Sequence, residues 1–133
     1  MRTVFADTFY FIALLNPLDG ANARAVAFTR NFSGQYVTTR DVLTEVADGL
    51  CGLNSRLAAC HLIERLPTNG AMRIIWSDEV LFNDAFSLYR ARPDKEWSLT
   101  DCISFVVMTR EGITEALTGD HHFEQAGFVA LLK

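Results

Sequence analysis

Val4-Phe5-Ala6-Asp7-Thr8, close to the start of the 133-residue chain, places an acid and a hydroxyl directly after a short apolar run. The apolar run follows polar residues, so we expect it to form a short buried β-strand. Asp and Thr favour the start of a helix, because their side-chain oxygens accept hydrogen bonds from free backbone N–H groups. The helical pattern that follows is expected to end at Asn16-Pro17, since proline does not continue a helix. This stretch therefore predicts a strand that leads directly into a helix.

The same order of strand and helix is expected along the rest of the chain. Further strands are predicted at residues 35–38, 72–76, 115–118 and 128–131. Further helices are predicted at residues 21–32, 39–52, 54–66, 78–90, 99–110 and 120–126. Strands that alternate with helices form a mainly parallel sheet with helices on both faces. The sequence therefore predicts an α/β fold with about five short strands, in one domain over residues 1–133.

The composition is that of a folded protein, because half of the residues are hydrophobic and 21% are charged. The formal net charge is −4, from 16 acids against 12 bases. A protein with this balance does not attract nucleic acid through its overall charge, and would depend on bound cations and local arginines. No apolar run is long enough to span a membrane and no signal peptide opens the chain, so we expect a soluble cytoplasmic protein.

The three cysteines, Cys51, Cys60 and Cys102, are odd in number and form no Cys-x-x-Cys motif. We expect reduced thiols, as in a cytosolic protein. All three lie in predicted apolar helical stretches and are expected to be small core residues. The chain has no P-loop and no Gly-x-Gly-x-x-Gly motif, so no binding loop for a nucleotide cofactor is predicted.

Four acids fall near the predicted carboxyl ends of the strands: Asp7, Glu45, Asp101 and Asp120. Asp7 directly follows the first strand, and Asp120 lies two residues after Thr118. Asp101 and Glu45 lie near the starts of two predicted helices. Ligands of open parallel sheets bind outside the carboxyl ends of the strands, so the four carboxylates are predicted to share one crevice. Clustered carboxylates repel one another unless a cation is present, and their oxygens suit Mg²⁺ or Mn²⁺.

Each of the four acids also has an ordinary structural explanation. Asp7 and Asp120 are good N-cap residues. Ser98-Leu99-Thr100-Asp101 has the form of a capping box, with Asp in the position that reaches back to the cap. Glu45 fits a half-exposed helical acid whose stem lies along apolar surface. Taken singly the acids indicate helix starts, and only their joint pattern predicts a metal site.

The adjacent histidines His121-His122 suggest a transition-metal site. Adjacent residues on a helix point about 100° apart, so the two side chains are not expected to bind one ion together. No cysteine or third histidine lies at a useful spacing. We therefore predict no zinc site, and expect His122 to pack or hydrogen-bond near the acids.

Four blocks of the sequence together resemble the PIN-domain ribonucleases, and most closely the VapC-type toxins of bacterial toxin–antitoxin pairs. In chain order the blocks are Phe5-Ala6-Asp7-Thr8, Leu43-Thr44-Glu45-Val46, Trp97-Ser98-Leu99-Thr100-Asp101-Cys102 and Leu117-Thr118-Gly119-Asp120-His121-His122-Phe123. Four blocks in this order, over nearly the whole chain, make the resemblance specific. It implies a PIN-like three-layer sandwich with a central sheet between two layers of helices.

The resemblance also implies roles for the residues in these blocks. The four acids would hold one or two Mg²⁺ or Mn²⁺ ions. Thr8 would present a hydroxyl to the site, while Thr118 and Ser98 would hold the acids by hydrogen bonds. Some relatives carry a further acid just after the fourth one, where this chain has His121-His122. Phe9 is bulkier than the small polar residue often found at its position, so a narrower entrance is expected.

The activity implied by the resemblance is that of a metal-dependent endoribonuclease, which cleaves RNA and is restrained by an antitoxin. The ion would lower the pKa of a bound water that attacks phosphorus. Arg40, beside the second block, is a candidate phosphate contact. Arg90, Arg92 and Lys95 are weaker candidates, and a solvated helix end and loop is the alternative explanation for them.

The consecutive aromatics Phe9-Tyr10-Phe11 cannot all face the core, so one or two are expected at the surface or in an interface. Leu50, Leu53 and Leu57 are expected to continue that surface. In the family that the sequence resembles, such surfaces receive an antitoxin peptide or a second copy of the toxin, so a homodimer is expected. Ordinary core packing is the alternative. Two other functions stay open, namely a non-toxin PIN ribonuclease in RNA processing and a catalytically silent PIN-like binding module.

Overall fold

A five-stranded sheet lies at the centre of the computed structural model, which describes residues 1–133. All neighbouring strands are parallel, in the order β3-β2-β1-β4-β5. The strands are β1 (Thr3–Ala6), β2 (Gln35–Thr39), β3 (Met72–Ile75), β4 (Glu115–Leu117) and β5 (Val129–Ala130). The predicted α/β fold with a parallel sheet of five short strands is therefore confirmed.

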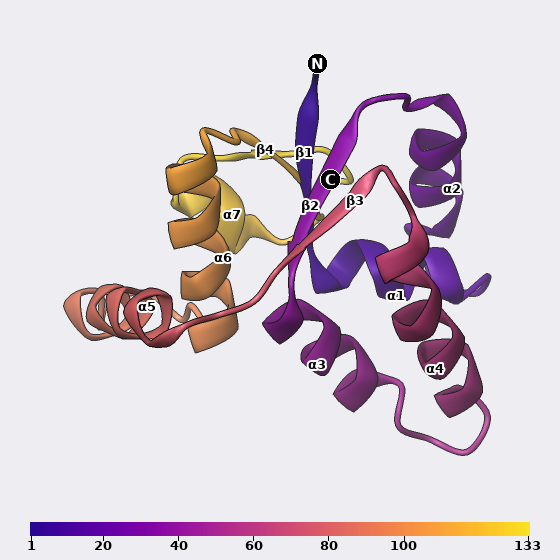
Figure 1. Cartoon of the computed structure of the whole chain (residues 1–133), viewed down its shortest axis with the longest axis horizontal. Coiled ribbons are helices and arrows are strands. Elements are labelled where there is room, and N and C mark those ends of the chain that lie inside the picture. The colour runs from indigo at the N-terminus through magenta and orange to yellow at the C-terminus, as the bar shows by residue number, and fades with distance from the viewer.

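Helices lie on both sides of this sheet (Figure 1). They are α1 (Thr8–Leu15), α2 (Asn22–Asn31), α3 (Arg40–Gly49), α4 (Arg56–Arg65), α5 (Glu79–Ala91), α6 (Leu99–Glu111) and α7 (His121–Gln125), with a short 3-10 turn at Leu66–Thr68. In Figure 1, α1, α2 and α4 lie to the right of the strands, and α6 and α7 lie to the left. This is the expected three-layer sandwich. In the same view α5 packs beside α6, at the outer edge of the molecule.

The hydrophobic core is built around the central strand β1. Val4, Phe5 and Ala6 are fully buried, as expected for a parallel strand that helices cover on both faces. The ring of Phe5 lies 6.4 Å from that of Phe123 on α7, and Phe123 meets Phe105 of α6 edge to face at 5.0 Å. These contacts fix α6 and α7 against the sheet, so the residues at their N-terminal ends have defined positions.

Because the strands are parallel, their carboxyl ends meet at one edge of the sheet. Ala6 pairs with Leu117, so the residues that follow them, Asp7 and Thr118, lie side by side. On the other side of β1, the buried hydroxyl of Thr38 donates a hydrogen bond of 2.7 Å to the Ala6 carbonyl. At the edge predicted to carry the functional site, the end of β1 is therefore held by β4 on one side and by Thr38 on the other.

Some predicted element boundaries are wrong by a few residues. The helix expected at residues 39–52 ends at Gly49, where the Leu50 N–H closes onto the Val46 carbonyl. The helix expected to begin at Asn54 begins at Arg56, after Ser55 at the cap position, and the Ser55 hydroxyl donates to the Leu50 carbonyl at 3.0 Å. The chain between these helices is a turn, which the apolar pattern alone did not reveal.

The prediction that all three cysteines lie in the core is wrong for two of them. Cys102 is buried on α6, but Cys51 and Cys60 are exposed. Cys51 lies in the turn after α3, and Cys60 lies on a solvent-facing side of α4. Cys60 is exposed because α4 lies in an outer layer of the molecule and no further element covers its outer side.

Two of the three consecutive aromatics on α1 are core residues, so packing explains most of that motif. Tyr10 and Phe11 are buried, and Phe9 is half-buried. The predicted leucine surface is confirmed for Leu53 and Leu57, which are 98% and 65% exposed, whereas Leu50 is partly buried against the core. None of the helices has the length and apolar character needed to cross a membrane.

Candidate active site

Asp7 stands where β1 ends and α1 begins, and it is the most buried of the four acids, at 5% exposure. Its backbone has the extended conformation of an N-cap residue, with φ −89° and ψ 164°. Its side chain, however, makes no capping hydrogen bond. Instead, Oδ2 accepts a hydrogen bond of 2.8 Å from the hydroxyl of Thr118. Helix capping therefore does not explain why a carboxylate is buried here.

The electrostatic environment of Asp7 penalises its charge. Burial, together with the nearby charges of Asp101 and Glu45, raises the pKa of Asp7 to about 7, although the hydrogen bond from the Thr118 hydroxyl acts to lower it. Two other carboxylates thus add to the electrostatic cost of a charged Asp7. Without a cation, the ionised form of Asp7 is costly at neutral pH.

Asp101 is both a helix cap and a member of this cluster. Its N–H donates to Ser98 Oγ at 2.9 Å, and its Oδ2 accepts from the Ser98 N–H at 3.1 Å, which completes the predicted capping box of α6. Burial raises the pKa of Asp101, and the charge of Asp120 raises it too, whereas Ser98 and His122 lower it. The capping box and the acid cluster are therefore compatible, because the box fixes the direction of the carboxylate.

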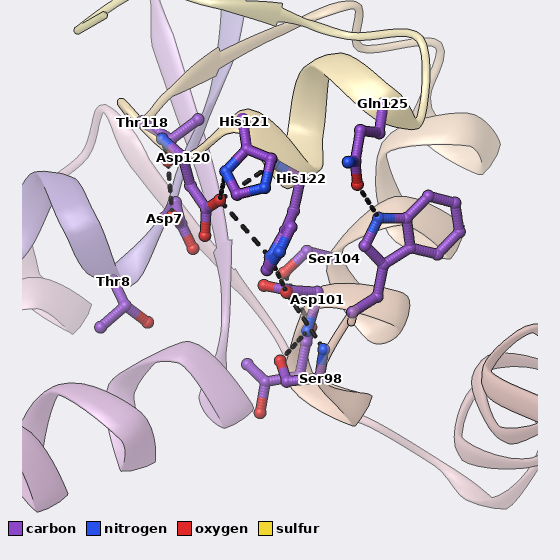
Figure 2. Close-up of polar contacts among 12 residues, drawn as sticks. Asp7, Thr8, Ser98, Asp101, Ser104, Thr118, Asp120, His121, His122 and Gln125 are labelled. Atoms are coloured by element: carbon purple, nitrogen blue, oxygen red, sulfur yellow. Dashed lines mark hydrogen bonds and ion pairs between the residues drawn. The ribbon is translucent and has the colours of Figure 1, made fainter. Parts of the chain in front are cut away.

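Asp120 begins α7 and is linked to Asp7 through one hydroxyl. Asp120 Oδ1 accepts a hydrogen bond of 2.9 Å from the His122 N–H, and the Asp120 N–H donates to Thr118 Oγ1 at 3.0 Å. Because the same Thr118 hydroxyl donates to Asp7, it orders both acids. Figure 2 shows the Asp7 and Asp120 carboxylates directed into the same space, with Asp101 on the other side of it.

Glu45 approaches the cluster from α3. Its Oε1 accepts a hydrogen bond of 2.5 Å from the hydroxyl of Thr8, the first residue of α1. Thr8 is adjacent to Asp7, so this bond brings Glu45 to the rim of the site. The structure thus places the four predicted acids at the carboxyl edge of the sheet, and it gives Thr8, Ser98 and Thr118 each a hydrogen bond to one of them.

His122 lies between two of the acids, as its expected role near the site requires. Its Nδ1 is 3.2 Å from Asp101 Oδ2 and 3.4 Å from Asp120 Oδ1 (Figure 2). His121 is close as well, with Nδ1 3.5 Å from Asp120 Oδ1, although its side chain is 71% exposed. The prediction that the two histidines diverge is wrong, since their rings are 4.4 Å apart. Both stand in the first turn of a five-residue helix, where they turn towards the same Asp120 oxygen.

The donor set of the cluster fits a hard dication. Burial and the charges of neighbouring carboxylates raise the pKa values of Asp7 and Asp101. A divalent ion that binds oxygen would remove this penalty, and Mg²⁺ and Mn²⁺ are ions of that kind. The residues present therefore suit the predicted metal.

The three candidate RNA-binding arginines lie outside the acid cluster. The Arg40 guanidinium is stacked on the ring of Trp76, 3.6 Å from its centroid. Arg90 lies over Phe86 at 4.8 Å. Arg92 is paired with Asp94 through two hydrogen bonds of 2.9 Å, so its charge is largely neutralised. No hydrogen bond or ion pair joins any of them to the four acids.

Two features of the site were not predicted from the sequence. Gly119, between Thr118 and Asp120, is in contact with the ring of Phe9, and a Cβ at Gly119 would lie only 2.6 Å from that ring. Trp76 was assigned to a strand, but it follows β3 and is exposed beneath Arg40. A glycine before Asp120 is consistent with a close contact at that position, but the sequence does not indicate that the contact is with Phe9.

A parallel α/β sandwich with a cluster of acids at the carboxyl edge of its sheet is the arrangement of a PIN-like domain. No protein-family model matches the chain. The chain is, however, 30% identical over 129 residues to the 23S rRNA-specific endonuclease VapC20 of Mycobacterium tuberculosis strain H37Rv, with 95% of each protein covered. The same values hold for VapC20 of strain CDC 1551 / Oshkosh. The chain therefore belongs to the VapC family of PIN-domain proteins.

Solved structures give the same result at the level of the fold. The crystal structure of M. tuberculosis VapC20, described as a Sarcin-Ricin loop cleaving toxin, superposes with a TM-score of 0.83 at 27% identity and covers 95% of this chain and 96% of that one. FitAcB from Neisseria gonorrhoeae has a TM-score of 0.66 at 21% identity, covering 96% and 94%. FitAB bound to an IR36 DNA fragment has the same score and identity, covering 96% and 92%.

Proposed function

We propose that this chain is a divalent-metal-dependent endoribonuclease that hydrolyses RNA phosphodiester bonds, and that it is the toxin of a type II toxin–antitoxin pair. The 30% identity to the endonuclease VapC20 over nearly the full length supports the activity. The main structural support is the buried Asp7 carboxylate. Its side chain makes no capping hydrogen bond to α1, and burial raises its pKa to about 7. A buried carboxylate without a structural task is typical of a functional site.

The ion, Mg²⁺ or Mn²⁺, would be held by Asp7, Asp101 and Asp120, with Glu45 as a further ligand or through water. When bound, such an ion activates a water molecule and stabilises the departing oxygen of the phosphodiester. The protein's own part is to hold the ligands in place. Thr118 orients Asp7 and Asp120, and the capping box orients Asp101. His122, beside two of the acids, is placed to carry a proton to or from the reacting oxygens.

The substrate is proposed to be RNA, and the sarcin–ricin loop of 23S rRNA is the first candidate, because VapC20 is described as acting on it. Arg40 stacked on exposed Trp76 offers both a cation for phosphate and an aromatic face for a base. Arg90 over Phe86 offers a second such pair. Arg92 is the weakest of the three candidates, because Asp94 already binds its guanidinium.

The direct test is cleavage of a 23S rRNA fragment by the purified protein. We expect cleavage with Mg²⁺ or Mn²⁺, none with EDTA, and none by Asp7→Asn. The matched control is Asp48→Asn, the same chemical change at an exposed position of α3. Full activity of a folded Asp7→Asn variant would contradict the site, and activity in EDTA would contradict the role of the metal.

We also propose an antitoxin protein as the partner, a homodimer as the free state and the cytoplasm as the compartment. The exposed apolar side chains support contact with other chains; on and beside α5 they are Trp76, Val80, Phe82, Phe86 and Tyr89. Light scattering of the purified protein and co-expression with the neighbouring reading frame test these points. A monomer that is not toxic on expression would instead favour a non-toxin ribonuclease.

A further inference from the structure

The two histidines at the start of α7 form a compact group of metal-binding atoms with Asp120. The potential ligand atoms of Asp120, His121 and His122 all lie within 4.8 Å of one another. The His121 Nδ1 and the His122 Nδ1 are 3.5 Å and 3.4 Å from the same oxygen, Asp120 Oδ1. Two nitrogens and one oxygen are thus close enough to one another to bind a single ion, next to the four acids.

The two distances to Asp120 Oδ1 are close to the separation between ligands of a tetrahedral ion, and the third pair lies within 4.8 Å. Ligands that are each about 2.0–2.1 Å from a tetrahedral zinc ion lie about 3.4 Å from one another. The two measured separations from Asp120 Oδ1 are within about 0.1 Å of this value. Three protein ligands of the His₂-carboxylate type, with water in the fourth position, form a common zinc arrangement. Two of the three ligand separations therefore already suit a bound ion.

The donor types distinguish this group from the acid cluster. Oxygen ligands suit Mg²⁺ and Mn²⁺, whereas imidazole nitrogens suit Zn²⁺ and related transition ions. His122 is held in place, with its side chain 18% exposed between Asp101 and Asp120, while the exposed His121 is free to turn. The His122 imidazole is held in place and the His121 imidazole can adjust its position. Both lie in the first turn of α7, so the two ligands need no other element to bring them together.

We propose that Asp120, His121 and His122 form a binding site for a divalent transition metal such as Zn²⁺, distinct in donor type from the acid cluster. Because Asp120 belongs to both groups, an ion on the histidines withdraws this carboxylate from the cluster. Zn²⁺ is then an inhibitor of cleavage supported by Mg²⁺, a consequence that rests on the proposed function. The binding itself does not rest on it.

Calorimetric titration of Zn²⁺ into the full-length protein, in the presence of excess Mg²⁺, tests the site. We expect one Zn²⁺ per chain, and an affinity lowered by at least about tenfold in His121→Ala and in His122→Ala, because each variant loses a direct ligand. His61→Ala is the matched control, since His61 is the remaining histidine and lies exposed on α4. Its affinity should equal that of the wild type. His121 is exposed, so His121→Ala will fold even if His122→Ala does not.

Three results would overturn the site: no binding of Zn²⁺, unchanged binding by His121→Ala, or an equal loss in His61→Ala. The Asp7→Asn variant separates this site from the nuclease. We expect that variant to lose cleavage and to keep Zn²⁺ binding. Loss of Zn²⁺ binding in Asp7→Asn would place the ion in the acid cluster and contradict the histidine site. Zn²⁺ binding by a wild-type protein that cleaves no RNA would contradict only the proposed function.

Discussion

Among single residues, Asp7 gives the strongest indication of a metal site. Its carboxylate is buried, accepts a hydrogen bond from Thr118 and lies among other acids, and its pKa is raised to about 7 from 3.8. The folded protein therefore binds the Asp7 proton more tightly than the unfolded chain does. Consequently the contribution of Asp7 to stability falls as the pH rises from about 4 to about 7, and stays unfavourable above that range.

Asp7→Asn should therefore stabilise the metal-free protein at about pH 8, by roughly 1–3 kcal/mol. The advantage should shrink towards pH 4, where the wild-type carboxyl is protonated. Asn is a suitable replacement because its side-chain oxygen can still accept the Thr118 hydrogen bond. Urea unfolding in EDTA at several pH values measures the difference, with Asp48→Asn as the control. Identical pH profiles for wild type and Asp7→Asn would show that Asp7 is not a strained charge.

Thr118→Val tests the hydroxyl that links Asp7 to Asp120. Loss of this hydroxyl should lower the affinity for Mn²⁺ about 10–100-fold, because the two acids lose their common anchor. Thr38→Val is the control, since its buried hydroxyl bonds only to the Ala6 carbonyl. Both variants should lose about 1 kcal/mol of stability. Equal Mn²⁺ affinities in Thr38→Val and Thr118→Val would mean that the hydroxyl has no special part in the site.

At the scale of elements, the sequence revealed most of what positions the site. The order of strands and helices and the capping box at Ser98 and Asp101 are local features. Local features are encoded in a few adjacent residues, so they can be predicted. The end of α3 and the exposure of Cys51 and Cys60 depend on which elements cover one another, so they could not be predicted.

The acids and the histidines differ in the same way. The acids were predictable as a group because parallel strands bring their carboxyl ends to one edge, and because four blocks together resembled one family. The convergence of His121 and His122 depends on side-chain rotamers in a short helix that Asp120 caps. Ideal helix geometry predicts that the two side chains point apart. That expectation fails here because side chains in the first turn of a helix can turn back towards the capping residue.

Ser98→Ala tests whether the start of α6 orients Asp101. Without the hydroxyl, the capping box is lost and stability should fall by about 1 kcal/mol. Metal affinity should fall as well, because the Asp101 backbone loses its anchor. Asp78→Ala removes the cap of α5, where Asp78 accepts from the Leu81 N–H, without touching the site. Thermal unfolding and Mn²⁺ titration of both variants decide the matter: a fall in metal affinity for both would indicate a general loss of structure.

At the scale of the whole molecule, charge limits how RNA is bound. The net charge is −4, and four of the 16 acids are those of the candidate site. Long-range attraction to a polyanion is therefore weak, and binding must come from the ion and from local arginines. Arg40 is the best placed of these, because its guanidinium is held flat on Trp76 and pairs with no carboxylate.

Arg40→Gln should raise KM for RNA by about 3–10-fold with little change in kcat, as expected for the loss of one phosphate contact. Arg56→Gln, at an exposed position of α4, is the control for a simple change in net charge. Steady-state cleavage at constant ionic strength measures both. An equal rise in KM in the two variants would mean that overall charge, and not the Arg40–Trp76 pair, governs binding.

Diffraction from crystals soaked in Mn²⁺, recorded at an energy where manganese scatters anomalously, would locate the bound ion and show whether the four acids hold it. We predict a peak within about 2.5 Å of carboxylate oxygens from at least two of Asp7, Asp101 and Asp120, with Glu45 at the same cavity. The peak should vanish in Asp7→Asn crystals. A Mn²⁺ peak that touches none of these carboxylates, or no peak at saturating Mn²⁺, would contradict a metal-dependent nuclease built from these four acids.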